Sequence, residues 1–272
     1  MDKYLVLGNP IAQSRSPSIH QLFAKQTDQN IAYDKQLVEL DNFNNHINTL
    51  IAQGIKGVNV TMPFKEQALA ISDQLSDRAE LAGAVNTLSF VDGKIFGDNT
   101  DGVGLVNDLK SQQVEFQGKR ILLLGAGGAA RGVLLPLLSE NPALLCIANR
   151  TVSKAESLVA TIKDSRAQAI SFAQTQEFDF DIIINATSTS LSADIPPISS
   201  QCISINTVCY DMVYSKEETT FLKWCRAHGA KQVIDGLGML VGQAAESFRI
   251  WRGVMPDIAP VLANLRVELS KD

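Results

Sequence analysis

The sequence has no stretch approaching the roughly 20 apolar residues that a membrane-spanning helix needs. The apolar run at its start, within MDKYLVLGNP, is also too short for a secretion signal. Basic residues are not in excess, because 24 lysines and arginines against 29 acidic residues give a net charge of −5. We therefore expect a cytoplasmic protein with no nucleic-acid or membrane partner.

Patterns for metal binding and for disulfides are missing as well. The four cysteines, Cys146, Cys202, Cys209 and Cys225, form no CxxC pair and no zinc spacing, and the three histidines are scattered. Most of the cysteines have apolar neighbours, which favours small buried thiols in a reducing compartment. The sequence predicts no metal site, and it leaves both a monomer and a homodimer open.

Short apolar runs alternate with helical patterns along the 272 residues, 45% of which are hydrophobic. This length suits one large or two ordinary domains, and the alternation predicts α/β architecture with mostly parallel sheets. The first series of predicted strands is Tyr4–Gly8, Tyr33–Leu40, Gly57–Thr61 and a hairpin of Ala84–Phe90 with Lys94–Gly97. The predicted helices between them are Pro17–Lys25 and Phe43–Gln53.

A second series of elements starts near Lys119, after a predicted connecting helix at Asp101–Gln112. Its predicted strands are Arg120–Leu124, Ala143–Ala148, Ala167–Ser171, Asp181–Asn185 and Ile203–Val208. Its predicted helices are Ala129–Ser139, Ser153–Thr161, Met239–Trp251 and Pro256–Leu269. The two series predict two α/β domains.

The clearest general motif is 119-KRILLLGAGGAARG-132, in which an apolar strand runs into Gly125-x-Gly127-x-x-Ala130 and a helical pattern follows. In such a unit Gly125 makes the tight turn, Gly127 lets the backbone approach a pyrophosphate, and Ala130 allows close packing of helix and strand. The N-terminus of the helix then offers free N–H groups to the phosphates. This context favours dinucleotide binding over a purely structural glycine turn.

The next strand ends in 147-IANRTVSK-154, at the place where NAD-binding units carry an acidic residue. Here Asn149 replaces the carboxylate. Arg150, Thr151 and Lys154 supply donors and positive charge, a composition that suits a 2′-phosphate and so favours NADP. The alternative is a polar loop in which Thr151 caps an ordinary helix.

Hydroxyl and amide side chains gather at strand ends in the N-terminal half. In 8-GNPIAQSRSPSIH-20, Ser16 followed by Pro17 is typical of a helix N-cap, and Ser14 adds a second hydroxyl. Two hydroxyls at a helix N-terminus suit a carboxylate ligand, although a plain cap is the simpler interpretation.

The stretch 57-GVNVTMPFKE-66 places a lysine against its local electrostatics. A strand runs to Thr61, Pro63 ends it, and Lys65 falls in the first turn of a predicted helix. The partial positive charge at a helix N-terminus disfavours a cation there, and local rules are often broken at functional sites. A solvated surface lysine is the alternative.

Together these segments resemble shikimate dehydrogenase. The similarity runs in order over nearly the whole chain through GNPIAQSRSPSIH, GVNVTMPFKE, GAVNT, GDNTDGVGL, LLGAGGAARG, ANRT, INATS, YDMVY, DGLGMLVGQAAESF and WRG. The resemblance implies an enzyme that reduces 3-dehydroshikimate to shikimate with NADPH, on the route to chorismate and the aromatic amino acids. It also implies a substrate-binding domain of residues 1–101 and 238–272 and a Rossmann NADP-binding domain of residues 102–237.

The resemblance further implies a role for single residues. Lys65 would be the catalytic acid and base, with Asp101 as its partner. The substrate would contact Ser14, Ser16, Asn59, Thr61, Lys65, Asn86, Asp101, Tyr214 and Gln243. The cofactor would contact Asp77, Gly125, Ala126, Gly127, Gly128, Ala129, Asn149, Arg150, Thr151, Lys154, Asn185, Thr187, Ser188, Met212, Gly236 and Met239.

One local departure and two rival functions accompany this interpretation. The family usually has a glycine shortly after INATS, whereas this chain continues as INATSTSLS, so the loop near the nicotinamide should differ in shape.

A quinate/shikimate dehydrogenase with broader substrate range or NAD use is disfavoured by Arg150, Ser14 and Thr61. A non-catalytic, dinucleotide-binding regulator is disfavoured by the presence of Lys65 and Asp101.

Overall fold

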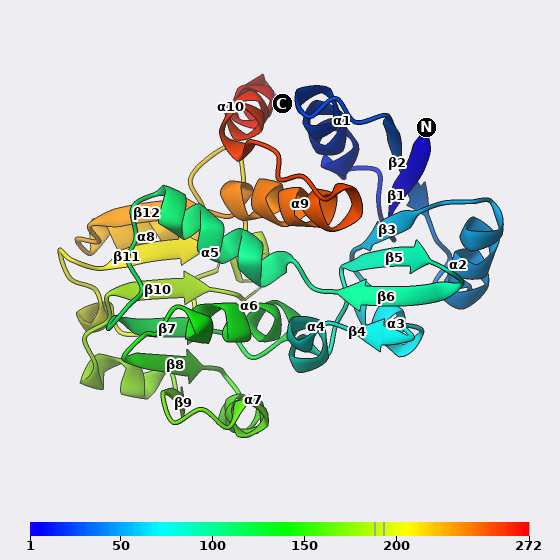
Figure 1. Cartoon of the computed structure of the whole chain (residues 1–272). Coiled ribbons are helices and arrows are strands. Elements are labelled where there is room, and N and C mark those ends of the chain that lie inside the picture. Colours follow the sequence, from blue (N-terminus) through cyan, green and yellow to red (C-terminus); the bar gives the residue numbers. More distant parts are fainter. Residues whose placement is uncertain (188, 193, 272) are drawn as a thin grey trace. The chain divides into compact units, whose positions relative to one another are not determined.

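Two six-stranded sheets organise the part of the chain that the structure, a computed structural model, describes: residues 1–187, 189–192 and 194–271 (Figure 1). Unit 1 comprises Met1–Gly104 and Leu240–Leu265, and unit 2 comprises Leu105–Met239 and the residues from Arg266 on. Each unit combines one sheet with helices, so the predicted α/β class is confirmed. The domain boundaries expected from the sequence stay a prediction.

The sheet of unit 1 is mixed and has the order β2-β1-β3-β5-β6-β4. Its strands are β1 (Asp2–Gly8), β2 (Ile31–Leu37), β3 (Gly57–Val60), β4 (Gln74–Leu75), β5 (Thr87–Val91) and β6 (Lys94–Asp98). Strand β1 is parallel to both β2 and β3, whereas β5 is antiparallel to β3 and β6. The predicted β5–β6 hairpin is confirmed, and Asp92 and Gly93 at its turn both have positive φ, as a two-residue hairpin turn requires.

Helices of unit 1 bury apolar residues, several of them against this sheet. They are α1 (Ser16–Gln26), α2 (Phe43–Ala52), α3 (Lys65–Ala70), α4 (Asp77–Ala82) and the larger part of α9 (Leu237–Arg252) and of α10 (Ile258–Lys271). One core cluster joins Ile47 of α2 and Phe64 beside α3 to Val58 and Leu88 of the sheet. These contacts hold the end of β3 and the start of α3 in a fixed place.

The predicted N-cap of α1 is wrong by one residue. The helix begins at Ser16 itself, and Arg15 occupies the N-cap position without a side-chain cap bond. Proline lacks the N–H that a first helical turn leaves unpaired, so Pro17 fits inside that turn as well as at its first position. The Ser16 hydroxyl is instead within 3.3 Å of the Ser14 hydroxyl.

Unit 2 contains an all-parallel sheet in the order β12-β11-β10-β7-β8-β9, seen from top to bottom on the left of Figure 1. Its strands are β7 (Arg120–Leu124), β8 (Leu144–Ala148), β9 (Ala167–Ile170), β10 (Ile182–Asn185), β11 (Val208–Asp211) and β12 (Gln232–Asp235). This is the doubly wound nucleotide-binding order, in which strand order reverses between β7 and β10. The predicted Rossmann arrangement is confirmed.

Both faces of this sheet are covered, which explains its continuous apolar strands. In β7, Ile121 and Leu123 pack into one core cluster while Leu122 and Leu124 pack into another. Alternate side chains of a strand point to opposite faces, so a strand between two layers is apolar at every position. The helices of this unit are α6 (Gly128–Ser139), α7 (Val152–Ile162), α8 (Thr220–Ala227) and most of α5 (Asp101–Ser111).

The predicted strand Ile203–Val208 is wrong, because β11 begins only at Val208. A turn occupies the preceding residues: Thr207 Oγ1 accepts from Ser204 N at 2.9 Å, and Thr207 N donates to Ser204 O at 3.0 Å. Serine and threonine side chains compete with strand pairing through such local bonds. Strand β12 and helix α8 were not predicted from the sequence.

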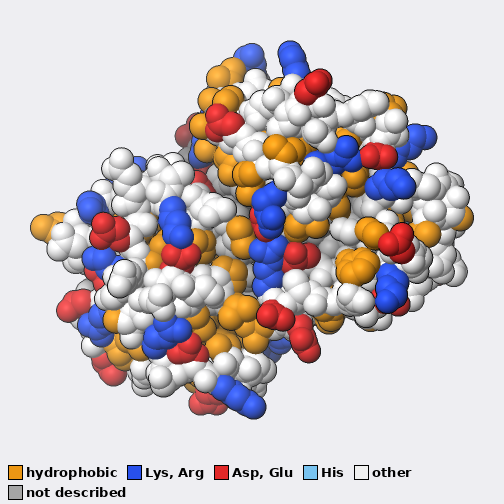
Figure 2. Space-filling model, viewed as in Figure 1, with side chains coloured by type: hydrophobic (Ala, Val, Ile, Leu, Met, Phe, Trp, Pro, Cys, Tyr) orange, Lys and Arg blue, Asp and Glu red, His pale blue; other side chains and the backbone are white. Residues whose placement is uncertain are grey.

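Charged side chains of both signs are interspersed on the face in view in Figure 2, in keeping with a net charge of −5. Within residues 1–187, 189–192 and 194–271, no helix combines the length and apolar character needed to cross a membrane.

Candidate active site

Lys65 is the first residue of α3, as expected from the sequence. Its Nζ lies 2.5 Å from Oδ2 of Asp101, the first residue of α5, and the two side chains are 32% and 16% exposed. A cation at the N-terminus of α3 is electrostatically unfavourable, whereas a carboxylate at the N-terminus of α5 is favourable. The negative charge of Asp101, in contact with Lys65, offsets the unfavourable position of the lysine. The structure therefore brings the expected acid–base pair together within unit 1.

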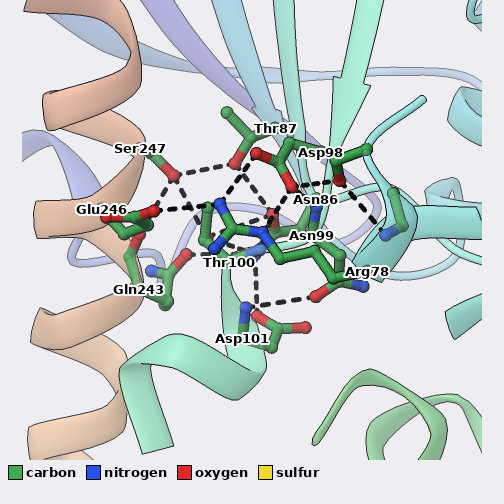
Figure 3. A network of polar contacts seen from close by, with 12 residues as sticks. Arg78, Asn86, Thr87, Asp98, Asn99, Thr100, Asp101, Gln243, Glu246 and Ser247 are labelled. Carbon is green, nitrogen blue, oxygen red and sulfur yellow. Dashed lines mark hydrogen bonds and ion pairs between the residues drawn. The ribbon is translucent and has the colours of Figure 1, made fainter. Parts of the chain in front are cut away.

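The side-chain amide of Asn86 fixes the second oxygen of Asp101 (Figure 3). Its Nδ2 donates to Asp101 Oδ1 at 2.8 Å, while its Oδ1 accepts from Thr87 Oγ1 at 2.8 Å and from Thr100 N at 2.9 Å. Two donors on Oδ1 determine which way the amide faces. The same Nδ2 lies 3.4 Å from Oε1 of Gln243 on α9, so two more of the expected substrate residues are neighbours here.

Asn59 is more deeply enclosed than a residue that contacts substrate usually is. It is 6% exposed, its Oδ1 accepts from Tyr33 Oη at 2.7 Å, and its Nδ2 donates to Asn86 O at 3.1 Å and to Ser247 Oγ at 3.0 Å. Sequence reasoning missed Tyr33 and Ser247; for Ser247 the available signal was its place one helical turn after Gln243.

The remaining expected substrate residues fall into two groups. Ser14 and Ser16 lie together at the start of α1, and Thr61 is half-buried directly after β3, so these three belong to unit 1. Tyr214 belongs to unit 2, three residues beyond the end of β11.

An ion-pair network that sequence reasoning did not find connects α4, β6 and α9 within unit 1 (Figure 3). Arg78 donates to Asp98 through two nitrogens, at 2.7 and 2.8 Å, and to Glu246 Oε1 at 3.0 Å. The partners hold the pKa of the Asp98 carboxyl below its ordinary value against the opposing effect of burial. The network braces the strand that leads to Asp101 against the helix that carries Gln243.

The glycine turn of unit 2 has the shape that a pyrophosphate requires. Gly125 has φ of +109°, and a Cβ there would lie 3.2 Å from the Ala186 carbonyl oxygen, so only glycine suits the turn. A Cβ on Gly127 or Gly128 would meet nothing within 4 Å, and Gly127 caps α6 without a side-chain bond. The two glycines therefore leave room beside the start of α6, where the first N–H groups have no acceptor within the helix, and this fits a phosphate ligand.

The segment after β8 supplies cations at a second helix start. Thr151 is the N-cap of α7 and makes no side-chain cap bond, and Asn149 Nδ2 donates to the Thr151 carbonyl at 2.9 Å. Arg150, Thr151 and Lys154 are all exposed. Two cations and a hydroxyl around a helix N-terminus fit a phosphate group, as the 2′-phosphate of NADP has.

The loop after β10 is held by side chains where the family usually has a glycine. Asn185 Oδ1 accepts from Thr187 Oγ1 at 2.6 Å, and Ser190 Oγ donates to Asp211 Oδ2 at 2.5 Å. Ser190 thus connects the loop to the end of β11. Ser188 lies outside the described residues.

Four residues that the resemblance gives to the nicotinamide end belong to unit 2, and three of them are in contact. Met212 N donates to Asn185 O at 3.0 Å, and a Cβ on Gly236 would lie 2.1 Å from the Met212 carbonyl oxygen. The fourth, Met239, packs against the same core cluster as Met212. Asp77, by contrast, is an exposed residue at the start of α4 in unit 1.

A doubly wound sheet with an open glycine turn, together with a lysine–aspartate pair in a network of amides and hydroxyls, defines a nucleotide-dependent dehydrogenase with a separate substrate unit. Within the residues that the structure describes, no group of three or more metal-ligating side chains occurs.

Comparison with known proteins identifies the particular family. Three family models match: a shikimate dehydrogenase substrate-binding domain at residues 6–88, shikimate/quinate 5-dehydrogenase at 108–193, and the C-terminal domain of shikimate 5′-dehydrogenase at 236–266. The NADP(+) shikimate dehydrogenase of Colwellia psychrerythraea is 60% identical over 269 residues, which cover 99% of this chain and 98% of that protein.

Solved structures agree with this assignment. An Ael1 enzyme from Pseudomonas putida superposes with a TM-score of 0.95 at 42% identity, covering 97% of this chain and 98% of that one. The shikimate 5-dehydrogenase of Thermus thermophilus, in complex with NADP(H) and shikimate, gives a TM-score of 0.88 at 32% identity, covering 99% of this chain and 100% of that one. The chain belongs to the shikimate dehydrogenase family.

Proposed function

We propose that this protein catalyses the reversible, NADPH-dependent reduction of 3-dehydroshikimate to shikimate, with Lys65 as the acid and base and Asp101 as its partner. The observation that carries the proposal is the 2.5 Å contact between Lys65 Nζ and Asp101 Oδ2, next to the amide of Asn86. The reaction supplies the precursor of chorismate and the aromatic amino acids, in accord with the family.

The chemistry divides between cofactor and protein. NADPH, when bound, supplies the hydride that reduces the carbonyl carbon. Lys65 donates a proton to the carbonyl oxygen as that oxygen becomes a hydroxyl, and it takes the proton back in the reverse direction. Asp101 orients the ammonium group, and Asn86 keeps Asp101 turned toward it.

Recognition of the substrate rests on neutral polar groups. Ser14 and Ser16 at the start of α1 are suited to the ring carboxylate, since a helix N-terminus favours an anion, and Tyr214 is proposed for the same end of the ring. Thr61, Asn86 and Gln243 are suited to the hydroxyls and the reacting oxygen. Analogues that lack a hydroxyl would leave these groups unpaired and bind poorly.

NADP is the cofactor that the chain's own residues fit. The pyrophosphate is assigned to Gly125, Ala126, Gly127, Gly128 and Ala129. The 2′-phosphate region is assigned to Asn149, Arg150, Thr151 and Lys154, and the nicotinamide arm to Asn185, Thr187, Ser188, Met212, Gly236 and Met239. Asp77 is also assigned to the cofactor, as the resemblance implies.

The alternative function is a quinate/shikimate dehydrogenase that uses NAD, and one family match supports it. The family model matching residues 108–193 is described for both shikimate and quinate. The segment after β8 argues against the use of NAD. It carries the exposed cations Arg150 and Lys154, whereas NAD-binding units have a carboxylate there that binds the 2′-hydroxyl of the ribose.

A four-way assay tests the proposal, with shikimate or quinate as substrate and NADP⁺ or NAD⁺ as oxidant. We expect the kcat/KM for shikimate with NADP⁺ to exceed the other three by about a hundredfold or more, the scale on which buried polar sites discriminate. Equal rates with quinate or NAD⁺ would establish the broader enzyme. Absence of turnover, in protein that binds NADPH, would instead establish a dinucleotide-binding regulator.

We also propose that the protein works in the reducing cytoplasm, as a monomer or a homodimer. Its four cysteines are all free and buried, which is usual for proteins of that compartment. Light scattering coupled to size-exclusion chromatography would determine the oligomeric state, and a larger assembly would contradict this proposal.

A further inference from the structure

Asp108 is a buried carboxylate in unit 2 that the proposed chemistry does not use. It is 6% exposed on α5, and its Oδ2 accepts from the hydroxyl of Tyr210, which is fully buried on β11, at 2.7 Å. Burial raises the pKa of Asp108 to about 6. Burying a carboxylate beside a neutral hydroxyl alone lowers the stability of the fold. We therefore expect Asp108 to make a further favourable contact.

That contact is the N-terminus of α9. The Asp108 carboxylate lies against the first turn of this helix, because a Cβ on Gly238, the second residue of the helix, would lie 2.0 Å from Asp108 Oδ1. N–H groups of a first helical turn have no acceptor within the helix, and the helix dipole favours a carboxylate there. Asp108 therefore places a carboxylate at the N-terminus of α9 from another helix.

A second carboxylate supports the same turn. Asp235 Oδ1 accepts from Leu237 N at 3.2 Å, and Asp235 Oδ2 accepts from Arg266 Nη1 at 2.5 Å. Arg266 thus neutralises Asp235 in direct contact, while its charge acts on Asp108 only from a greater distance. The two acidic groups differ in their contacts: Asp235 accepts from Leu237 N, whereas the Asp108 carboxylate lies against Gly238.

The glycine at position 238 is what lets Asp108 approach. A Cβ on Gly238 would lie 2.0 Å from Oδ1 and 2.1 Å from Cγ of Asp108, far inside van der Waals contact. Any other residue at this position would displace the carboxylate from the helix. Gly238 and Asp108 are therefore a matched pair, although 130 positions separate them in the printed sequence.

We propose that Asp108 is a positioning residue for the nicotinamide end of the cofactor site, acting through the first turn of α9. By lying against Gly238, it sets the position of the first turn of α9, and with it the positions of Met239 and of Gly236 just before the helix. The inference rests on the proposed assignment of Gly236 and Met239 to the cofactor.

Two ligands separate a local effect from a general loosening of unit 2. NADPH carries the nicotinamide, whereas adenosine 2′,5′-bisphosphate carries only the adenosine half with its 2′-phosphate. In Asp108→Ala we expect the Kd for NADPH to rise about tenfold, in line with the loss of a partly buried carboxylate from a helix N-terminus. The Kd for adenosine 2′,5′-bisphosphate should stay within about twofold of wild type.

Two results would overturn the proposal: an unchanged Kd for NADPH, or an equal rise for both ligands. Asp108→Asn keeps the volume and one oxygen acceptor, so it provides a folded variant if the alanine variant is unstable, and it should weaken NADPH binding by a smaller factor. These titrations need no substrate. A wild-type protein that binds NADPH normally but does not oxidise shikimate would contradict the proposed function and leave this inference standing.

A double-mutant cycle tests the pairing with Gly238 directly. Gly238→Ala alone should weaken NADPH binding about as much as Asp108→Ala, because the new methyl group displaces the carboxylate. In the Asp108→Ala background the same change should cost less than about twofold, since the group it collides with has gone. Fully additive losses would show that Gly238 is needed for another reason and would refute the pairing.

Discussion

Nζ of Lys65 lies 2.5 Å from Oδ2 of Asp101, although 36 positions separate the two residues along the chain. Each residue starts a helix, α3 and α5 respectively. Asn86 holds the other oxygen of Asp101 at 2.8 Å. The carboxylate therefore cannot turn away from the lysine without losing a second bond.

Replacing Lys65 by methionine should lower kcat for shikimate oxidation about a thousandfold, because general acid–base catalysis contributes on that scale. The Kd for shikimate, measured by equilibrium titration, should change little. Lys56→Met is a matched control, since Lys56 is an exposed lysine just before β3. Wild-type turnover in Lys65→Met would eliminate the proposed role.

Ser247→Ala should destabilise the protein by about 1–2 kcal/mol in urea unfolding, because it removes one hydrogen-bond partner from each of two buried side chains. The Ser247 hydroxyl lies 2.8 Å from Thr87 Oγ1 and 3.0 Å from Asn59 Nδ2, and it also donates to its own helix at Gln243 O. Since Asn59 then loses one of the bonds that orient it, KM for shikimate should rise as well.

Ser157→Ala is the control for this variant. Ser157 donates to Ser153 O one turn back in α7, as Ser247 does in α9, but it is exposed. Its loss should cost well under about 0.5 kcal/mol. Equal effects of the two substitutions would mean that the buried network adds nothing.

Arg150→Ala should raise KM for NADP⁺ about tenfold and leave KM for NAD⁺ nearly unchanged, because only NADP carries the 2′-phosphate. Lys163→Gln removes a cation from the opposite end of α7 and should alter neither value. If Arg150→Ala raised both KM values alike, the arginine would serve a part of the cofactor that NADP and NAD share.

Stability should fall on mild acidification because of His20. This residue is fully buried, stacks on Tyr33 with ring centroids 4.0 Å apart, and has its pKa lowered to about 3 by burial. In the unfolded chain it takes up a proton near its ordinary pKa of about 6.5. The contribution of neutral His20 to the free energy of unfolding is therefore fully present above pH 6.5 and is lost progressively as the pH falls toward 3.

Between pH 6.5 and pH 5 the expected loss from His20 is about 2 kcal/mol. His20→Phe keeps an aromatic ring against Tyr33 but cannot titrate, so its unfolding free energy should fall less over the same range. Urea unfolding at both pH values measures this difference. Identical pH slopes in the two proteins would show that His20 does not limit acid stability.

Where local rules determine structure, the sequence was informative. Pro63 correctly predicted that Lys65 begins a helix, and Asp92-Gly93 correctly predicted the β5–β6 hairpin. The apolar run of β7, followed by the glycine motif, correctly predicted a strand that leads through a glycine turn into a helix. Each of these signals involves residues that are close together in the chain.

Contacts between residues that are far apart in the chain could not be predicted from the sequence. Asp108 and Tyr210 are 102 positions apart, and no local pattern connects a serine on α9 such as Ser247 with Asn59 on β3. The wrong placement of β11 has a different cause, because the hydroxyls of Ser204 and Thr207 form a turn in a segment that is apolar enough for a strand.

The bonds around Asn86 have a consequence for how tightly a substrate can be held. Its amide is oriented by protein groups before any ligand arrives, and so is the amide of Asn59. The rotational entropy of these side chains is therefore lost when the chain folds rather than when the substrate binds. A preorganised site of this kind can bind a small, highly hydrated ring without further ordering of its own side chains.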